Sequence, residues 1–131
     1  MQRTAVNPWP WSLQYAYNQA EVIEDAKRML VCAGQTATDA EGAPAHSGDM
    51  AAQLTLALEN LDAVLAGGGM SLADVVRLTI YTTDVDALFP HYGILAERLA
   101  SAGVTPPATL LGVTRLAFPD LLVEIDATAV Q

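Results

Sequence analysis

The chain has 131 residues, of which 52% are apolar and 16% charged, and its six basic and fifteen acidic side chains give a formal net charge of −9. This length predicts a single domain over residues 1–131 that buries one core. The negative charge repels nucleic acid and anionic membranes at long range, so neither is expected as a partner. The high apolar share predicts that part of the surface meets another subunit.

Cys32 is the only cysteine, which excludes an internal disulfide. Its apolar neighbours in residues 29–33 predict a buried structural thiol. No run approaches the roughly 18 to 20 apolar residues that cross a bilayer. Residues 1–11 also lack the charged and then apolar pattern of a secretory signal, so we expect a cytoplasmic protein.

Residues 1–14 form an N-terminal arm that contains Asn7-Pro8-Trp9-Pro10-Trp11. Proline lacks an amide donor and disfavours helical geometry in the residue before it, so regular helix is excluded over residues 1–11. Trp9 and Trp11 each carry a large apolar area. We expect them to pack on the body of the protein or on a neighbour; the alternative is that one of them walls a ligand pocket.

Two segments rich in apolar and aromatic residues, 15–23 and 29–33, flank polar residues 24–27. This pattern predicts a β-hairpin between them. Gly34 interrupts the second segment, and residues 36–48 consist mainly of Thr, Asp, Gly, Pro, Ser and Ala. They predict a surface loop.

A helix is predicted from Asp49, because leucines recur at spacings of three and four and so share one helix face. They are Leu54, Leu58, Leu61 and Leu65. Asp49 or Ser47 can cap the start of this helix, and Gly67-Gly68-Gly69 can end it.

Residues 75–81 are rich in β-formers and predict a central strand. A second helix is predicted from a cap at Asp84 or Asp86 to about Ala102, with Gly103 as its stop. Strands follow at about 109–113 and 122–130, so the expected order is β-β-α-β-α-β-β. If the helices cover one face of the sheet, the other face needs cover from another subunit, because domains are layered around buried apolar surfaces.

The common catalytic patterns are missing from the sequence. The two histidines, His46 and His91, have neither a cysteine nor an HxxxH partner, so no zinc pattern is present. No serine lies in a GxSxG elbow. The glycines at 67–69 follow a helix instead of preceding one, which argues against a phosphate cradle.

Glu124 stands out because it lies between apolar residues in the last predicted strand. One interpretation is that it points outward on the polar side of the strand, as the alternation with Asp126 permits. The other is that it is partly desolvated with a raised pKa, which suits a general acid or base near neutral pH.

Several segments follow one another in an order that matches a known family. They are Tyr17-Asn18-Gln19-Ala20, Cys32-Ala33-Gly34-Gln35, Gln53 with Leu58-Glu59-Asn60-Leu61, Asp74-Val75-Val76-Arg77-Leu78-Thr79, Thr83-Asp84, Pro107-Ala108 and Val123-Glu124-Ile125-Asp126-Ala127. Together they resemble the Rid or YjgF-like family of reactive-intermediate deaminases over about residues 15–130.

The resemblance implies a chorismate-mutase-like α+β fold with one mixed β-sheet and two helices on one face. It also implies a homotrimer with ligand clefts at the subunit interfaces. The best-known members hydrolyse enamines and imines made by amino-acid dehydratases, and give a 2-oxo acid and ammonia. They need no metal or organic cofactor, so none is expected here; the expected partners are a small-molecule ligand and further copies of the chain.

The resemblance also assigns site residues. The family's cleft tyrosine falls on Tyr17, and the carboxylate that positions or activates the attacking water falls on Glu124. Gly34 and Gln35 match the backbone lining of the cleft, and Ala33 replaces the serine that usually precedes this glycine.

The second part of the implied site departs from the family. Tyr92 stands where the second helix usually contributes an asparagine. After Ala108, Thr109 replaces the arginine of the Pro-Ala-Arg motif, whose guanidinium forks onto the substrate carboxylate in a geometry that threonine cannot supply. Arg115 lies six residues further and aligns with another arginine of the family. The position is therefore expected to lack a cation, and the ligand to be neutral or anchored differently.

These observations predict a cofactor-independent hydrolase or deaminase of an imine, enamine or related small electrophile that is not anchored by an amino-acid carboxylate. The alternatives are a non-catalytic trimer that binds a small apolar metabolite, and a standard 2-imino acid deaminase. An endoribonuclease activity, which an older family label suggests, conflicts with the net charge of −9 and with Lys27 as the only lysine.

Overall fold

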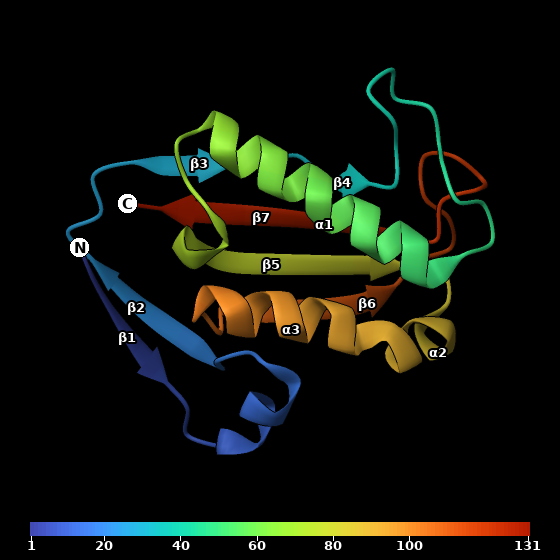
Figure 1. Cartoon of the computed structure of the whole chain (residues 1–131). Helices are drawn as coiled ribbons and strands as arrows, with labels where there is room; N and C mark the ends of the chain where they lie inside the picture. The colour runs from blue at the N-terminus through green and yellow to red at the C-terminus, as the bar shows by residue number, and fades with distance from the viewer.

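A mixed β-sheet with its helices on one face organises the chain, as the computed structural model of residues 1–131 shows (Figure 1). The strands are β1 (Gln2–Val6), β2 (Ala20–Glu24), β3 (Met29–Val31), β4 (Gln35–Thr36), β5 (Val75–Thr82), β6 (Ala108–Gly112) and β7 (Val123–Val130). The helices are α1 (Met50–Gly67), α2 (Val85–Leu88) and α3 (Tyr92–Ala102), with the short 3-10 helices η1 (Pro10–Tyr15), η2 (Leu72–Asp74) and η3 (Phe89–His91).

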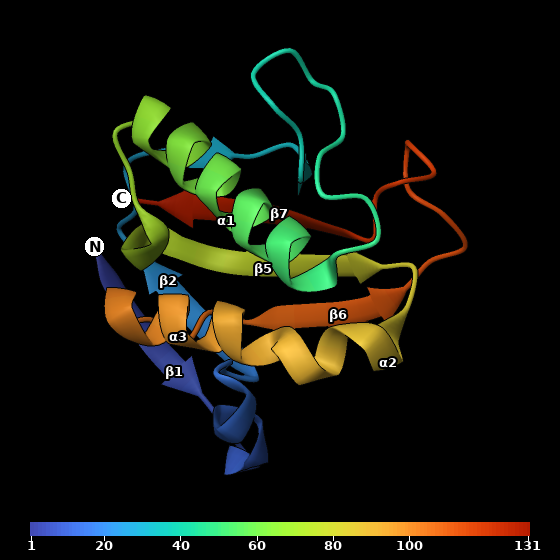
Figure 2. The same cartoon turned by 45° about the vertical axis from the view of Figure 1, so that its right-hand side comes forward.

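The main sheet has the order β3-β7-β5-β6, and β4 also pairs with β7. Strand β7 is antiparallel to its neighbours, whereas β5 and β6 run parallel. A parallel pair needs a crossover, and here α2 and α3 form it. Both long helices, α1 and α3, lie on the same side of the sheet (Figures 1 and 2). The predicted α+β class with a mixed sheet is therefore confirmed.

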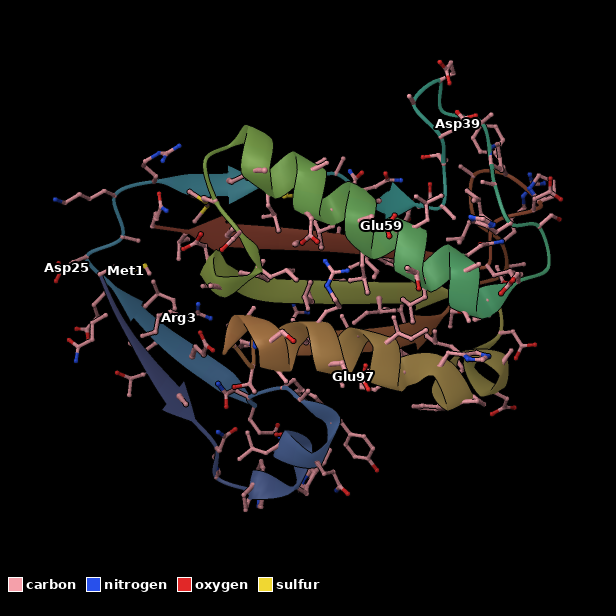
Figure 3. The ribbon with its side chains drawn as sticks, viewed as in Figure 1. Met1, Arg3, Asp25, Asp39, Glu59 and Glu97 are labelled. Atoms are coloured by element: carbon pink, nitrogen blue, oxygen red, sulfur yellow. The ribbon has the colours of Figure 1, made fainter.

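The predicted leucine stripe of α1 forms the centre of the core. Leu54, Leu58, Leu61 and Leu65 are each at most 1% exposed. They belong to one apolar cluster with the inward side chains of β5 and β7. The Asp49 side chain accepts a hydrogen bond from the Ala52 amide, which confirms the predicted cap. Glu59 on α1 and Glu97 on α3 are exposed on the sides of the helices that face away from the sheet (Figure 3).

The prediction of one continuous second helix is wrong. The Asp84 side chain does cap its start, by accepting a hydrogen bond from the Ala87 amide. However, the helix divides into α2 and α3, separated by η3, which contains Pro90. Proline has no amide hydrogen to donate inside a helix, so the helix breaks there. Gly103 ends α3 in the left-handed conformation, with φ of 68°.

The predicted hairpin between residues 15–23 and 29–33 is also wrong in this structure. Strand β2 pairs with β1, from Gln2 opposite Glu24 to Val6 opposite Ala20, and β3 pairs with β7 instead. The arm therefore contains a strand, and the β1–β2 hairpin forms a separate two-stranded sheet. Arg3, which points from β1, donates hydrogen bonds to the Ala73 and Val75 carbonyls at 2.8 Å and holds this hairpin beside the start of β5 (Figure 3).

Candidate functional site

Glu124 lies on the sheet face that turns away from the helices. The side chains of β7 alternate, with Val123 and Ile125 buried toward the helices and Glu124 half-buried on the opposite side. Partial burial, and secondarily the charge of Asp126 two residues further, raise the pKa of the Glu124 carboxyl. Both interpretations from the sequence thus hold in part, because the residue is on the outward face and is also desolvated.

Gly34 brings the backbone into contact with this carboxylate. A Cβ atom at position 34 would lie 2.7 Å from Glu124 Cδ and 2.9 Å from its Oε1. Any side chain would therefore displace the carboxylate or the strand. Next to it, Gln35 lies opposite Ile125 and Thr36 opposite Glu124 in the β4–β7 pair. The predicted group of Gly34, Gln35 and Glu124 is thus brought together, with Ala33 immediately before it.

Asn60 supports this group from α1, a role that the sequence analysis missed. Its Nδ2 donates hydrogen bonds to the carbonyls of Thr36 at 2.9 Å and Thr38 at 3.0 Å. These bonds hold β4 against the helix and so fix the segment that carries Gly34. The sequence did contain a signal for this role, because asparagine is a poor helix former and Asn60 falls in the interior of the predicted helix.

An apolar cavity of about 510 Å³ lies on the other side of the sheet, beside β6. Its lining comprises Trp11, Tyr15, Tyr17, Ile80, Phe89, Tyr92, Ala108 and Leu110. The rings of Trp11 and Tyr17 meet edge to face, with centroids 6.2 Å apart. The Tyr92 hydroxyl donates to the Tyr15 carbonyl at 2.8 Å. Burial, and secondarily Tyr17, raise the pKa of Tyr92, so its hydroxyl remains a proton donor.

The two tryptophans of the arm have different surroundings. Trp11 is 53% exposed but forms a wall of the cavity. That this cavity is a ligand pocket, as one of the two alternatives has it, stays a prediction. Trp9 is 63% exposed, so the chain itself does not bury it.

Thr109 lies on the face of β6 opposite to the cavity, between Ala108 and Leu110, which line it. The expectation that this position lacks a cation needs correction. The Arg77 guanidinium, from the neighbouring strand β5, donates a hydrogen bond to Thr109 Oγ1 at 2.8 Å. A guanidinium thus reaches this position from another strand, and it forms no ion pair within the chain.

A single chain does not bring all the predicted site residues together. Tyr17, Tyr92 and Ala108 line the cavity on the helix side of β6, whereas Glu124 lies on the opposite face of β7. Arg77 is also remote from Glu124, because the register pairs Glu124 with Tyr81, four residues further along β5. At a rise of about 3.3 Å per residue, the Cα atoms of Arg77 and Glu124 are therefore roughly 13 Å apart along the strand.

Fold and site together define a small α+β protein. A half-buried carboxylate with a raised pKa lies on one face of its sheet, and a cavity lined by aromatic and aliphatic residues lies on the other. The model of the family described as Endoribonuclease L-PSP matches residues 12–131. The chain therefore belongs to the Rid or YjgF-like family, as its motifs predicted.

Named relatives agree with this membership. The RutC family protein YjgH of Escherichia coli K12 is 30% identical over 97% of this chain and 95% of its own length. The 2-iminobutanoate/2-iminopropanoate deaminase of Salmonella typhimurium is 29% identical over 82% of this chain and 83% of its own. The crystal structure of the Rid family protein YyfB from Yersinia pestis is 33% identical and covers both chains completely, with a TM-score of 0.88.

None of the helices combines the length and the apolar character that a membrane span requires.

Proposed function

We propose that this protein hydrolyses a small imine or enamine without a metal or organic cofactor, and that Glu124 is its acid and base. The observation that carries the proposal is the Glu124 carboxylate, which is half-buried on Gly34, has a raised pKa and forms no ion pair within the chain. A desolvated carboxylate with a raised pKa is a stronger base than an exposed one, which favours proton transfer. The similarity to a named 2-iminobutanoate/2-iminopropanoate deaminase supports the same class of reaction.

The chemistry requires one proton carrier and one water molecule. The Glu124 carboxylate removes a proton from water as the oxygen attacks the carbon of the C=N bond, and the protonated carboxyl returns this proton to the nitrogen, which gives a neutral tetrahedral carbinolamine. The carboxylate then takes the proton of the new hydroxyl and passes it to the nitrogen as the C–N bond breaks, so that a carbonyl product and ammonia leave. Tyr17 is proposed as a hydrogen-bond donor on the side of the cleft.

The cavity supports a ligand with an apolar substituent. All eight of its lining residues are hydrophobic. Pockets that are mainly apolar with a few polar groups favour ligands of matching polarity. We therefore propose a substrate whose affinity comes from the cavity and not from an amino-acid carboxylate.

We also propose that the working form is a homotrimer with clefts between subunits. The sheet face that carries Glu124 has no helix over it (Figure 2). The separation of Tyr17 from Glu124 within one chain supports a site shared between copies.

The direct test is hydrolysis of a panel of imines generated in solution, with apolar neutral members and with 2-iminobutanoate, followed by release of ammonia. We expect turnover above the buffer rate on at least one neutral member. If binding raises the melting temperature but no member is turned over, the protein binds a metabolite without catalysis, because a ligand selective for the folded form stabilises it.

The pH dependence tests the electrostatic role of Asp126. A general base is active when deprotonated, so kcat/KM is expected to rise with pH through the raised pKa of Glu124. The charge of Asp126 is the second cause of that raised pKa. Asp126→Asn should therefore move the rising limb of the pH profile to lower pH.

Glu59→Gln is the matched control for this measurement, because it makes a comparable charge change on the exposed side of α1. The rising limb of the pH profile of Glu59→Gln should coincide with that of the wild type. An unmoved limb in Asp126→Asn would show that the charge of Asp126 does not set the limb.

The bond from Arg77 to Thr109 favours a second candidate, a 2-imino acid deaminase whose carboxylate anchor is the Arg77 guanidinium of a neighbouring copy, because within one chain the Cα atoms of Arg77 and Glu124 lie roughly 13 Å apart. A charge-assisted hydrogen bond contributes about 1.5–3 kcal/mol, or roughly 10-fold to 150-fold in affinity. If this candidate holds, Arg77→Ala should lower kcat/KM for 2-iminobutanoate by about that factor and leave a neutral imine unchanged.

Our first proposal predicts a different result for Arg77→Ala, namely a change of less than about 2-fold on both substrates. Thr109→Arg complements this measurement, since it restores the fork that the family motif contains. Activity on 2-iminobutanoate that appears only in Thr109→Arg would show that the anchor is missing from the wild type.

A further inference from the structure

Strand β3 leaves one edge of the main sheet unpaired. It hydrogen-bonds to β7 on one side only, because the order of the sheet is β3-β7-β5-β6. The Cys32 amide donates to the Ala127 carbonyl on the β7 side. Because backbone groups alternate along an antiparallel strand, those of Met29 and Val31 point to the free side. The side chains of these two residues are 69% and 72% exposed.

Strand β2 has a free edge as well. It pairs only with β1, and the two-stranded sheet that they form is mostly exposed on both faces. Few bonds join the segment from β1 to β2 to the rest of the chain: those of Arg3, the Asn18 amide that donates to the Thr105 carbonyl at 2.9 Å, and the Tyr92 hydroxyl that donates to the Tyr15 carbonyl at 2.8 Å. An isolated two-stranded hairpin is marginally stable, so further strand pairing would stabilise it.

The two free edges match in register. Four residues, 25–28, connect the end of β2 to the start of β3. A hairpin closed by this connector would pair Val22 with Val31 and Ile23 with Leu30. Val22 is 48% exposed and Val31 is 72% exposed, so this pairing would cover apolar side chains on both strands.

The same register has a consequence for the candidate site. Continued toward the N-terminus, it places Tyr17 within one residue of Thr36, because the chain from Val31 to Gln35 has one residue more than the facing stretch of β7 from Thr128 to Ile125. Thr36 in turn lies opposite Glu124 in the β4–β7 pair. Tyr17 and Glu124 would then be two strands apart at nearly the same level of the sheet, with about 10 Å between their Cα atoms at a strand spacing of 4.8 Å.

The chain's own hairpin does not make this contact in the structure. Its Tyr17 lines the cavity beside β6, and Asn18 is bonded to Thr105, just before β6. Strands β6 and β3 form opposite edges of the sheet. A hairpin seated at the β6 edge of one copy can instead present the free edge of β2 to the β3 edge of a second copy.

We propose that the β1–β2 hairpin is shared between copies of this chain, with β2 of one copy added antiparallel to β3 of the next, and that this contact places Tyr17 beside the neighbour's Glu124. The inference deepens the proposed function, because it builds that site from two chains. The contact is head-to-tail, the kind of interface that forms a closed ring when the rotation between copies closes and an open filament when it does not.

Disulfide trapping tests the pairing without any activity assay. Cys32→Ala removes the native thiol, and Val22→Cys with Val31→Cys in that background places one thiol on each edge. Directly opposed residues of a hydrogen-bonded antiparallel pair have Cα atoms about 5.5 Å apart, which is within the disulfide range. We expect oxidation to give covalent oligomers on a non-reducing denaturing gel.

The controls separate the possible outcomes. Val6→Cys with Val31→Cys, whose first thiol lies on β1, should give no covalent oligomer. A monomer bridged within one chain would show that the hairpin closes on its own β3, and the absence of any bridge would show that the edges do not meet. Either result overturns the proposal, whereas the imine assay decides the proposed function separately.

A second measurement does not depend on introduced thiols. Val31→Pro removes the outward amide of β3 and leaves the bonds to β7, since proline is tolerated where an edge strand faces solvent. Val31→Thr keeps that amide and is the matched control. Light scattering should show a smaller assembly for Val31→Pro than for Val31→Thr; equal masses would contradict the exchange.

Discussion

Glu124→Gln is expected to lower kcat/KM for the hydrolysed imine by on the order of 10²–10⁴-fold, the usual contribution of a positioned general acid or base. Glutamine has nearly the same shape as glutamate and can still pack on Gly34, but its amide cannot take a proton from water. The fold should persist, because no hydrogen bond or ion pair of the Glu124 carboxylate holds the chain together. Initial rates of ammonia release, with the melting temperature measured in parallel, check both statements.

The control is Glu59→Gln, which makes the same chemical change at an exposed position of α1. Its rate should equal that of the wild type. If Glu124→Gln is as fast as the wild type, Glu124 has no part in the reaction. If neither protein turns over any imine, the binding-protein alternative gains support.

Gln53→Leu is expected to destabilise the fold by about 3 kcal/mol, since it removes three hydrogen bonds from backbone groups at roughly 1 kcal/mol or more each. The Gln53 side chain is fully buried. Its Nε2 donates to the carbonyls of His46 at 3.1 Å and Asp120 at 2.8 Å, and its Oε1 accepts from the Leu122 amide at 2.8 Å. One side chain thus ties α1 to two loops.

Urea unfolding measures this loss as a lower midpoint with an unchanged slope. Gln14→Leu is the matched control, because Gln14 is exposed and lies on η1, where the same substitution removes no such bond. A midpoint for Gln53→Leu that equals that of Gln14→Leu would mean that water replaces Gln53 as the partner of these backbone groups.

Local patterns predicted the elements whose residues form one buried stripe. The α1 leucines could be identified because only a helix puts spacings of three and four on one side. The pairing of β2 could not be predicted, because a strand pattern does not indicate which free edge the strand joins. In the structure, polar contacts between residues far apart in the sequence join the segments that contain β1 and β2: Arg3 donates to Glu21, and Asn7 donates to Asn18.

The site was predictable in its chemistry and not in its arrangement. Glu124 could be identified because a carboxylate among apolar residues is unusual in a strand. Its contact with Gly34 depends on how β4 pairs with β7, which no local pattern encodes. The bond from Arg77 to Thr109 depends likewise on the parallel register of β5 and β6.

The environment of Cys32 has a consequence for a protein proposed to handle electrophiles. The residue is 7% exposed, and burial together with the Asp126 charge raises the pKa of its thiol. The thiolate is the reactive form of cysteine, and a buried thiol with a raised pKa stays protonated. The only thiol of the chain is thus shielded from alkylation by reactive metabolites, and we expect the protein to resist inactivation by the electrophiles that it is proposed to hydrolyse.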